Sequence, residues 1–405
     1  GSTAAFDGRA AMSPAALTGR IDAEIADLAA LFAMAGQPAP DLPGGAGRGL
    51  TASGEVTYTE DTLNLRSGRL AQGPNSLVLS ADVTLADRPR VLARVSAGAL
   101  DLSPFMEGGD AAPDDGGDGW PREPLDVSGL QALDAELLFN ASSVDLGSGR
   151  LGRVETRTTL DAGRAVTEIR QLAVYEGGVR GSFVVNSRGG LSVRANLAGS
   201  GLALEPLLTD FADYDRLSTT GEATVNLLGV GNSVHDIMHS LSGDGSVTLG
   251  AGELRGLDLV GMIRNLDPSY AGEGARTIFD SVSASFVVNE GVLINEDLAV
   301  DAPLFTAEGE GVVALGPREL NYTVTAALLE GQQVRVPVRI TGPWSKPRFG
   351  LDLEKATEGR IGEELEGLRR QAEERLQEEV DRVTEDAARQ VQDRIGEELG
   401  IDSEA

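Results

Sequence analysis

Two histidines one helical turn apart form the first candidate site. His235 and His239, in the segment HDIMH, would lie on one face of a helix, with the spacing at which H-E-x-x-H motifs bind zinc. Asp236 stands where that motif has its glutamate base, and the chain has no third histidine. We therefore interpret the pair as ordinary helix residues and predict no metal site.

An acidic, glycine-rich stretch is the second candidate, for calcium. It carries Asp110, Asp114, Asp115 and Asp118. The ligand order of an EF-hand loop and its closing glutamate are both absent. We therefore predict a solvated surface loop near residues 107–124, and a second loop near residues 36–49, which is rich in proline and glycine.

No other short motif indicates an enzyme. The chain has no G-x-S-x-G elbow and no P-loop, and its lack of cysteine excludes disulfides and thiolate chemistry. The 63 acidic residues are so numerous that carboxylate pairs arise by chance. We predict a protein that is not an enzyme and has no cofactor.

Composition narrows the possible partners. The formal net charge is -29, and because a phosphate backbone repels such a chain, we predict no nucleic-acid partner. Hydrophobic residues make up 41% and aromatic residues 4%, which indicates a largely aliphatic core. No run of 18 apolar residues exists, so no segment of this sequence is predicted to span a bilayer as a helix.

Alternation of apolar and polar residues dominates the chain and is typical of strands in a sheet with one solvated side. In Ser76–Leu85 the apolar residues share one face, opposite Ser80 and Asp82, and four later segments repeat the pattern. We predict that this apolar face lines a groove, with the lining residues Leu77, Leu79, Val83, Leu85, Leu133, Leu137, Phe139, Val282, Phe286, Val288, Leu320, Tyr322, Val324, Val334, Val336, Val338 and Ile340.

The order of these elements predicts a mainly β fold. Hairpin-length turns such as Gly73-Pro74-Asn75 favour an antiparallel meander, with short helices at Asp27–Ala35, Ser233–Leu241 and Asp258–Leu266. Asp27 and Ser233 are the expected N-caps of the first two helices. A weak internal repeat relates Val95–Phe105 to Leu197–Leu207, and each copy leads into a short apolar or helical piece.

The last part of the chain changes period. From Glu354 to Gly400 apolar residues recur every three or four positions, which predicts one long amphipathic α-helix. We therefore divide the chain into a repetitive β-groove over residues 1–352 and a C-terminal helix over residues 353–405. The helix could cap the sheet, cover the groove or bind a partner, and capping is the simplest hypothesis.

A long apolar face must be covered, and scarce aromatics and a few short helices cannot cover 20 to 25 strands. The remaining solution is a curved half-pipe, on the order of 100 Å long at about 4.8 Å per strand. Lipid is a natural occupant, because exposing about 15 methylenes to water costs on the order of 12 kcal/mol. Ordinary sandwich core is the competing interpretation of the same pattern.

The order of motifs in the second half resembles the C-terminal region of the AsmA family. A short helix is followed by L-x-G-x-G in Leu217–Leu266, then by G-x-L-R-G-L-D-L. Phe279–Leu315 carries V-x-x-G-V-L, and T-G-P-x-x-x-P closes Val336–Asp352. The upstream chain is similar in style to the repeats of the family, so the resemblance covers roughly residues 4–352.

The resemblance implies function as well as fold. AsmA-like proteins are anchored in the inner membrane by an N-terminal helix, project a β-groove into the periplasm, and are linked to phospholipid transfer and outer-membrane biogenesis. The resemblance therefore implies phospholipid or another acyl lipid as ligand, an inner-membrane anchor upstream of Gly1, and a partner in the outer membrane or envelope. The alternative is a scaffold that assists assembly of outer-membrane proteins without conducting lipid. A secreted solenoid is disfavoured, since no regular repeat of 20 to 30 residues is present.

Overall fold

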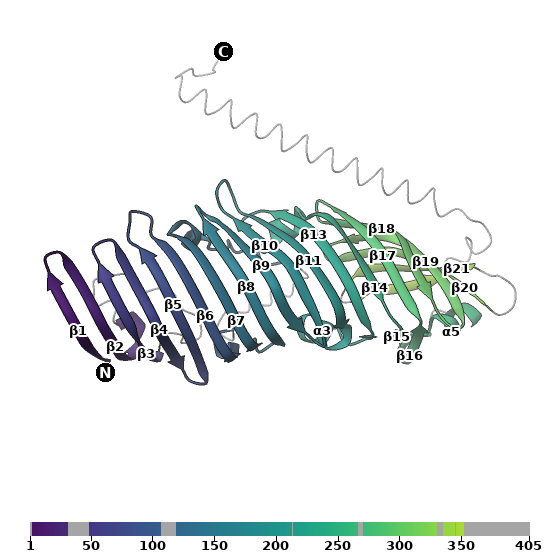
Figure 1. The fold of residues 1–405 in the computed structure, drawn as a ribbon. Coiled ribbons are helices and arrows are strands. Elements are labelled where there is room, and N and C mark those ends of the chain that lie inside the picture. The colour runs from purple at the N-terminus through teal and green to yellow at the C-terminus, as the bar shows by residue number, and fades with distance from the viewer. Residues whose placement is uncertain are drawn as a thin grey trace, which may run out of the picture.

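The protein, seen in a computed structural model, is built mainly from β-strands (Figure 1). The structure describes the residue ranges 2–30, 48–106, 119–212, 214–265, 270–329, 335–344 and 346–351. The predicted loops near 36–49 and 107–124 lie mostly outside these residues. The predicted C-terminal helix, residues 353–405, lies wholly outside them, so it stays a prediction.

Within the described residues, 19 strands form one sheet. Its first half contains β1 (Thr3–Met12), β2 (Ala15–Asp27), β3 (Arg48–Thr59), β4 (Thr62–Gln72), β5 (Asn75–Thr84), β6 (Arg90–Asp101), β7 (Asp134–Asp145), β8 (Arg150–Asp161), β9 (Arg164–Val174), β10 (Gly177–Asn186) and β11 (Ser192–Ala203). Its second half contains β13 (Thr220–Val230), β14 (Ser242–Leu249), β17 (Ser281–Asn289), β18 (Val292–Asp301), β19 (Phe305–Ala314), β20 (Glu319–Leu328), β21 (Arg335–Pro343) and β22 (Arg348–Leu351).

Each strand of this sheet pairs with the strands before and after it in that order, so the sheet is long, open and curved (Figure 1). Hairpin-length turns explain why most neighbours are antiparallel. One pair departs from the predicted meander: β6 and β7 are parallel, with Arg90 opposite Asp134. The reason is the long connection between them, because a parallel neighbour requires the chain to return to the starting edge of the sheet.

The register keeps apolar residues on one side of the sheet from strand to strand. Leu79 lies opposite Val95, which lies opposite Phe139. We call the side that carries these residues the apolar face and the opposite side the polar face. Further along, Ala195 lies opposite Leu227 on the apolar face, so the period-two pattern of separate strands becomes one continuous surface.

Smaller elements lie at the edges of the sheet. A second sheet has three strands, β12 (Leu217–Ser218), β15 (Gly252–Leu257) and β16 (Ala271–Phe279). The short helices are α2 (Ser103–Met106), η2 (Ser128–Gln131), α3 (Leu204–Ala212), α4 (Val234–His239) and α5 (Leu259–Asn265). The largest core cluster joins α5 and the small sheet to the C-terminal strands, through residues such as Met262, Phe279 and Phe305.

Two of the predicted helices are confirmed. α4 lies within Ser233–Leu241, and its N-cap is Ser233, whose hydroxyl accepts from Asp236 N while the Asp236 carboxylate accepts from Ser233 N. α5 lies within Asp258–Leu266. The first predicted helix starts where expected: residues 28–30 are helical and the Asp27 carboxylate accepts from Ala29 N at 2.9 Å, as an N-cap does, while the remainder of this helix lies outside the described residues.

The weak internal repeat corresponds to a repeated strand-to-helix corner. Val95–Phe105 spans the end of β6 and most of α2, and Leu197–Leu207 spans the end of β11 and the start of α3. In each copy one leucine near the strand end is buried, Leu100 in the first and Leu202 in the second. The repeated sequence therefore forms the same strand-to-helix corner at two places along one edge of the sheet.

Candidate functional site

The predicted lining residues that lie in described strands share the apolar face, as the strand pairing shows. In β5 and β7, Leu79 lies two strands from Phe139 with Val95 between them. In β20 and β21, Val324 pairs with Val338 and Tyr322 with Ile340. The half-buried members of the set are Leu77, Leu79, Val83, Leu133, Leu137, Phe139, Val282, Phe286, Leu320, Tyr322, Val324 and Ile340.

Three predicted lining residues are covered instead of open. Val288, Val336 and Val338 are at most 1% exposed. Val336 and Val338 belong to the core cluster beneath α5 and the small sheet, so they pack as core. At this end of the sheet the apolar face is therefore covered by α5 and the small sheet. Leu85 and Leu133 lie just outside β5 and β7, and Val334 lies outside the described residues.

Glycines on the apolar face allow aromatic rings of neighbouring strands to lie close to the backbone of the sheet. A Cβ added at Gly245 would lie 2.3 Å from Phe286 Cζ, so the end of the Phe286 ring lies over the glycine of the neighbouring strand. Phe6 covers Gly8 and Gly19 in the same way at the N-terminal end. The aromatic rings therefore form part of the surface and do not project far from it.

Two pairs of polar groups on the apolar face form hydrogen bonds within it. Thr158 and Thr167 are opposite each other, with their hydroxyl oxygens 3.0 Å apart. Near the C-terminal end, the Tyr322 hydroxyl donates to Asn295 Oδ1, and burial raises the pKa of Tyr322. Because these groups already have hydrogen-bond partners, placing hydrocarbon over them costs less free energy than it would over unpaired polar groups.

One edge of the sheet, which we call the α4 rim, holds the start of β7 and the turns that follow β8, β10, β17 and β19. A Cβ added at Gly229, at the end of β13, would lie 2.6 Å from Ile237 Cγ2, and one at Gly316, after β19, would lie 2.6 Å from the His239 imidazole. In a flat sheet, four strand intervals would separate these sites by about 19 Å. The six-residue α4 is only about 9 Å long, so the sheet must curl strongly around it.

A segment before β7 runs along the same rim. Trp120 Nε1 donates to Leu315 O at 2.7 Å, and the Arg318 guanidinium lies 3.9 Å from the centre of the Trp120 ring. Leu125 N donates to Asn232 O at 2.8 Å. The connection between β6 and β7 therefore touches the β19–β20 turn before it returns to β7, and it ties distant strands together.

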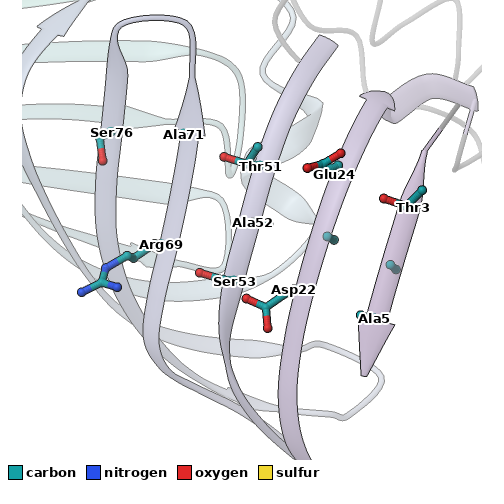
Figure 2. Close-up of a pocket in the computed structure, with 12 residues that line it drawn as sticks. Thr3, Ala5, Asp22, Glu24, Thr51, Ala52, Ser53, Arg69, Ala71 and Ser76 are labelled. Atoms are coloured by element: carbon teal, nitrogen blue, oxygen red, sulfur yellow. The ribbon is translucent and has the colours of Figure 1, made fainter. Parts of the chain in front are cut away.

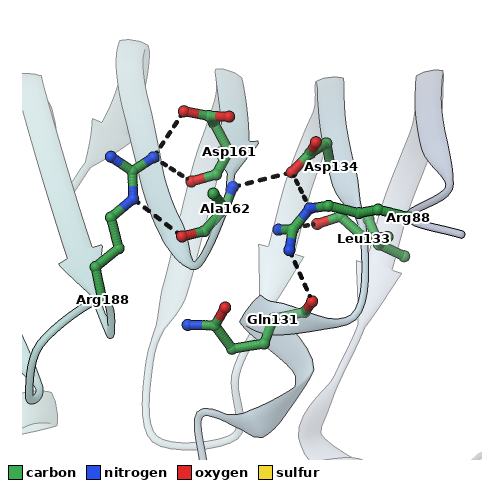
Figure 3. Close-up of polar contacts among 7 residues, drawn as sticks. All are labelled: Arg88, Gln131, Leu133, Asp134, Asp161, Ala162 and Arg188. Atoms are coloured by element: carbon green, nitrogen blue, oxygen red, sulfur yellow. Dashed lines mark hydrogen bonds and ion pairs between the residues drawn. The ribbon is translucent and has the colours of Figure 1, made fainter.

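The rim is completed by arginine contacts around the start of β7 (Figure 3). Arg88 Nε donates to Asp134 Oδ1 at 2.6 Å, and Ala162 N donates to the same oxygen at 2.9 Å. The Ala162 N–H, followed by Arg88, lowers the pKa of Asp134. Arg188 donates to the carboxylate of Asp161 at 2.6 Å. These contacts join successive turns and hold the rim in place.

The histidine pair has a local role in this structure. His239 Nδ1 lies 2.8 Å from His235 O and 2.9 Å from His235 Nδ1, so one ring nitrogen serves both contacts. Desolvation, and then the neighbouring His239, lower the pKa of His235. Among the described residues no group of three or more His, Cys, Asp or Glu side chains could hold a metal ion.

A glycine motif typical of dinucleotide-binding turns occurs at Gly147–Gly152, with the sequence GSGRLG. The structure places it in the hairpin between β7 and β8, which are antiparallel. A dinucleotide site requires a strand-to-helix turn whose helix N-terminus meets the pyrophosphate. The motif therefore serves here as a β-hairpin turn.

A large depression lies away from the apolar face. It has a volume of about 570 Å³ and lies on the polar face of β1 to β5, where Asp22, Ser53 and Arg69 project from neighbouring strands (Figure 2). Its lining mixes charged, polar and small side chains. The apolar face is an open surface with rims, which suits an extended ligand better than a compact one.

The described residues contain no helix long and apolar enough to cross a membrane. A comparison with protein families matches residues 105–298 to the AsmA family. No curated protein and no solved structure matches the chain. The matched range runs from α2 to β18 and therefore includes β7, α4 and the small sheet, but not β6, the parallel neighbour of β7.

Proposed function

The chain belongs to the AsmA family over residues 105–298, and from this we propose that it shields phospholipid on its apolar face and transfers it between the inner and outer membranes. In this role the protein is not an enzyme and supports outer-membrane biogenesis from the periplasm. An inner-membrane anchor and a partner in the outer membrane or envelope belong to the same proposal.

One observation carries the proposal: the apolar face continues across neighbouring strands and stays only half-buried over most of its length. Leu79, Phe139 and Phe183 all belong to it, and Phe183 is 38% exposed. A folded protein without a ligand gains little by leaving such a long face open to water. Hydrocarbon would cover it and would itself be removed from water.

The energetics suit transfer along the face. An acyl chain of about 15 methylenes loses on the order of 12 kcal/mol when it leaves hydrocarbon for water, and contact with aliphatic side chains removes much of that cost. Because the Phe286 ring leans over Gly245, which has no side chain, it projects less from the face there and obstructs movement less. Dispersion contacts with an aliphatic surface are individually weak and similar from site to site, which favours sliding.

Two matched pairs of substitutions test the proposal. Leu79→Asp and Phe286→Asp place a charge on the apolar face, whereas Val78→Asp and Val287→Asp place the same charge one residue away on the polar face. Val78 and Val287 are 52% and 50% exposed, so the controls should fold. We expect the first pair to lower co-purifying phospholipid at least about fivefold, because a charge in contact with hydrocarbon costs several kcal/mol. The controls should not change it.

Phospholipid is measured by mass spectrometry of an organic extract of the purified protein, with circular dichroism as the check on folding. If the wild-type protein carries no phospholipid, or if all four variants carry as much as the wild type, lipid does not lie on the apolar face. Either result would leave the scaffold role as the better account. Val336→Asp is unsuitable here, because Val336 is fully buried and the charge would destabilise the fold.

A further inference from the structure

A group of arginines gathers on the polar face of the first half of the sheet. Arg94, Arg153 and Arg170 line one depression of about 380 Å³, together with Ser96 and Asn140. All three arginines are exposed. Within the part of the chain that the structure describes, none of the three guanidinium groups forms an ion pair or a hydrogen bond. In a chain of net charge -29, this is a local excess of unpaired positive charge.

Irregular pairing brings the arginines together. Leu151 pairs with Val174 and Val154 with Leu172, so Arg153 lies in a bulge of β8. Glu155 then pairs with Gln171 and Thr156 with Ile169, so Arg170 is an extra residue in β9. Bulges redirect side chains and are common beside functional sites.

A fourth arginine lies next to the bulge in β9. In β10, Val179 pairs with Leu172 and Gly181 with Ile169, which places Arg180 opposite Arg170 and Gln171. Arg180 is exposed and, among the described residues, also has no ion-pair partner. Like charges opposite each other in a sheet are destabilising, so the fold retains an arrangement that an anion would relieve.

We propose that this depression, lined by Arg94, Arg153 and Arg170, binds a phosphate group. Guanidinium groups bind phosphate oxygens through paired, charge-assisted hydrogen bonds. Ser96, Asn140 and Ser142 line the same depression and supply neutral polar groups. A phosphate carrying nearly two negative charges at neutral pH suits three cationic groups better than a single carboxylate does.

One side chain opposes the ligand. Glu155 also lines the depression and forms no ion pair among the described residues. Its carboxylate repels an anion, so its removal should strengthen binding. Replacing Glu155 should therefore change the phosphate affinity in the opposite direction from replacing an arginine of the same depression.

The test is calorimetric titration of the full chain at low salt, with inorganic phosphate and with glycerol 3-phosphate as probes. Arg153→Ala and Arg170→Ala should each weaken binding about tenfold, which corresponds to about 1.4 kcal/mol per charge-assisted contact. Glu155→Gln should tighten binding about threefold, by removing a repulsion of similar kind. Arg194→Ala, an exposed arginine of β11 outside the depression, is the control and should change nothing.

Both probes carry the phosphate chemistry that defines the site. Tighter binding of glycerol 3-phosphate would identify a lipid headgroup as the source, and tighter binding of inorganic phosphate would identify the free ion. Absence of binding by the wild type, equal binding by the wild type and an Arg153→Ala, Arg170→Ala double variant, or no tightening in Glu155→Gln would overturn the proposal. The site lies on the polar face, so its failure would leave the proposed lipid role on the apolar face untouched.

Discussion

Glu310 of β19 is a single residue whose ionisation the fold opposes. It lies opposite Thr323, and its Oε1 atom is buried without a hydrogen-bond partner among the described residues. Burial, and then the neighbouring Glu296, raise the pKa of Glu310. A carboxyl group whose pKa is raised by folding stabilises the protein below its unfolded-state pKa, and this contribution is lost as the pH rises through the folded-state pKa.

We therefore predict that Glu310→Gln stabilises the protein at pH 7. The gain should be a few tenths to about 1 kcal/mol, since much of the side chain contacts solvent. It should shrink as the pH falls through the raised folded-state pKa, and it should be lost once the pH is below the unfolded-state pKa of a glutamate, near 4.5. Urea unfolding at pH 7 and pH 4 measures the difference. Glu308→Gln is the control: Glu308 is an exposed neighbour on the same face, and its ion pair with Arg335 is solvent-exposed and therefore weak. A gain of equal size at both pH values would show that charge is not the cause.

At the scale of elements, the parallel pair of β6 and β7 depends on contacts made before either strand begins. Arg88, in the turn before β6, donates to Gln131 O at 3.0 Å, to Leu133 O at 3.2 Å and to Asp134 Oδ1 at 2.6 Å (Figure 3). Parallel pairing is slightly weaker per residue than antiparallel pairing. The arginine therefore fixes the start of β7 beside the start of β6.

Replacing Arg88 by alanine should destabilise the protein by about 1–2 kcal/mol, because it removes one hydrogen bond to a carboxylate and two to backbone carbonyls at a half-buried position. Arg90→Ala is the matched control, since the Arg90 side chain is exposed, makes no hydrogen bond among the described residues and acts on Asp134 only through a weaker electrostatic attraction. Hydrogen exchange should show faster opening of β7 in the Arg88 variant only. Equal unfolding free energies for the two variants would contradict this role.

At the scale of the whole molecule, the sheet is much longer than one lipid. With strands spaced about 4.8 Å apart, the first eleven strands alone extend roughly 50 Å. An acyl chain spans about half of a hydrocarbon core of roughly 30 Å. The C-terminal end is filled by the cluster around Met262, Val336 and Val338, so the open part of the apolar face lies toward the N-terminal strands.

We therefore predict that the protein carries more than one phospholipid per chain, which native mass spectrometry would count. Leu79→Asp, in the open part, should reduce the number bound, and Val78→Asp should not. A wild-type chain that never binds more than a single phospholipid would mean that only a local site, and not the length of the sheet, receives lipid.

The sequence by itself determined the elements and the two faces of the sheet. The alternation in Ser76–Leu85 depends only on neighbours along the chain, and so does the N-cap at Ser233; both predictions are confirmed. The motif order in the second half likewise predicted the family whose model matches residues 105–298. Such signals are visible in sequence because period and capping are set within a few residues.

Only the tertiary structure decided which apolar residues are open and which are covered. Val324 and Val338 have the same period-two pattern, yet Val338 is buried beneath elements that come from residues 252–279. The parallel pairing of β6 with β7 and the gathering of arginines at the bulges were also not visible in the sequence. Coverage, pairing partners and bulge positions depend on contacts between residues far apart in the chain, and local periodicity carries no information about them.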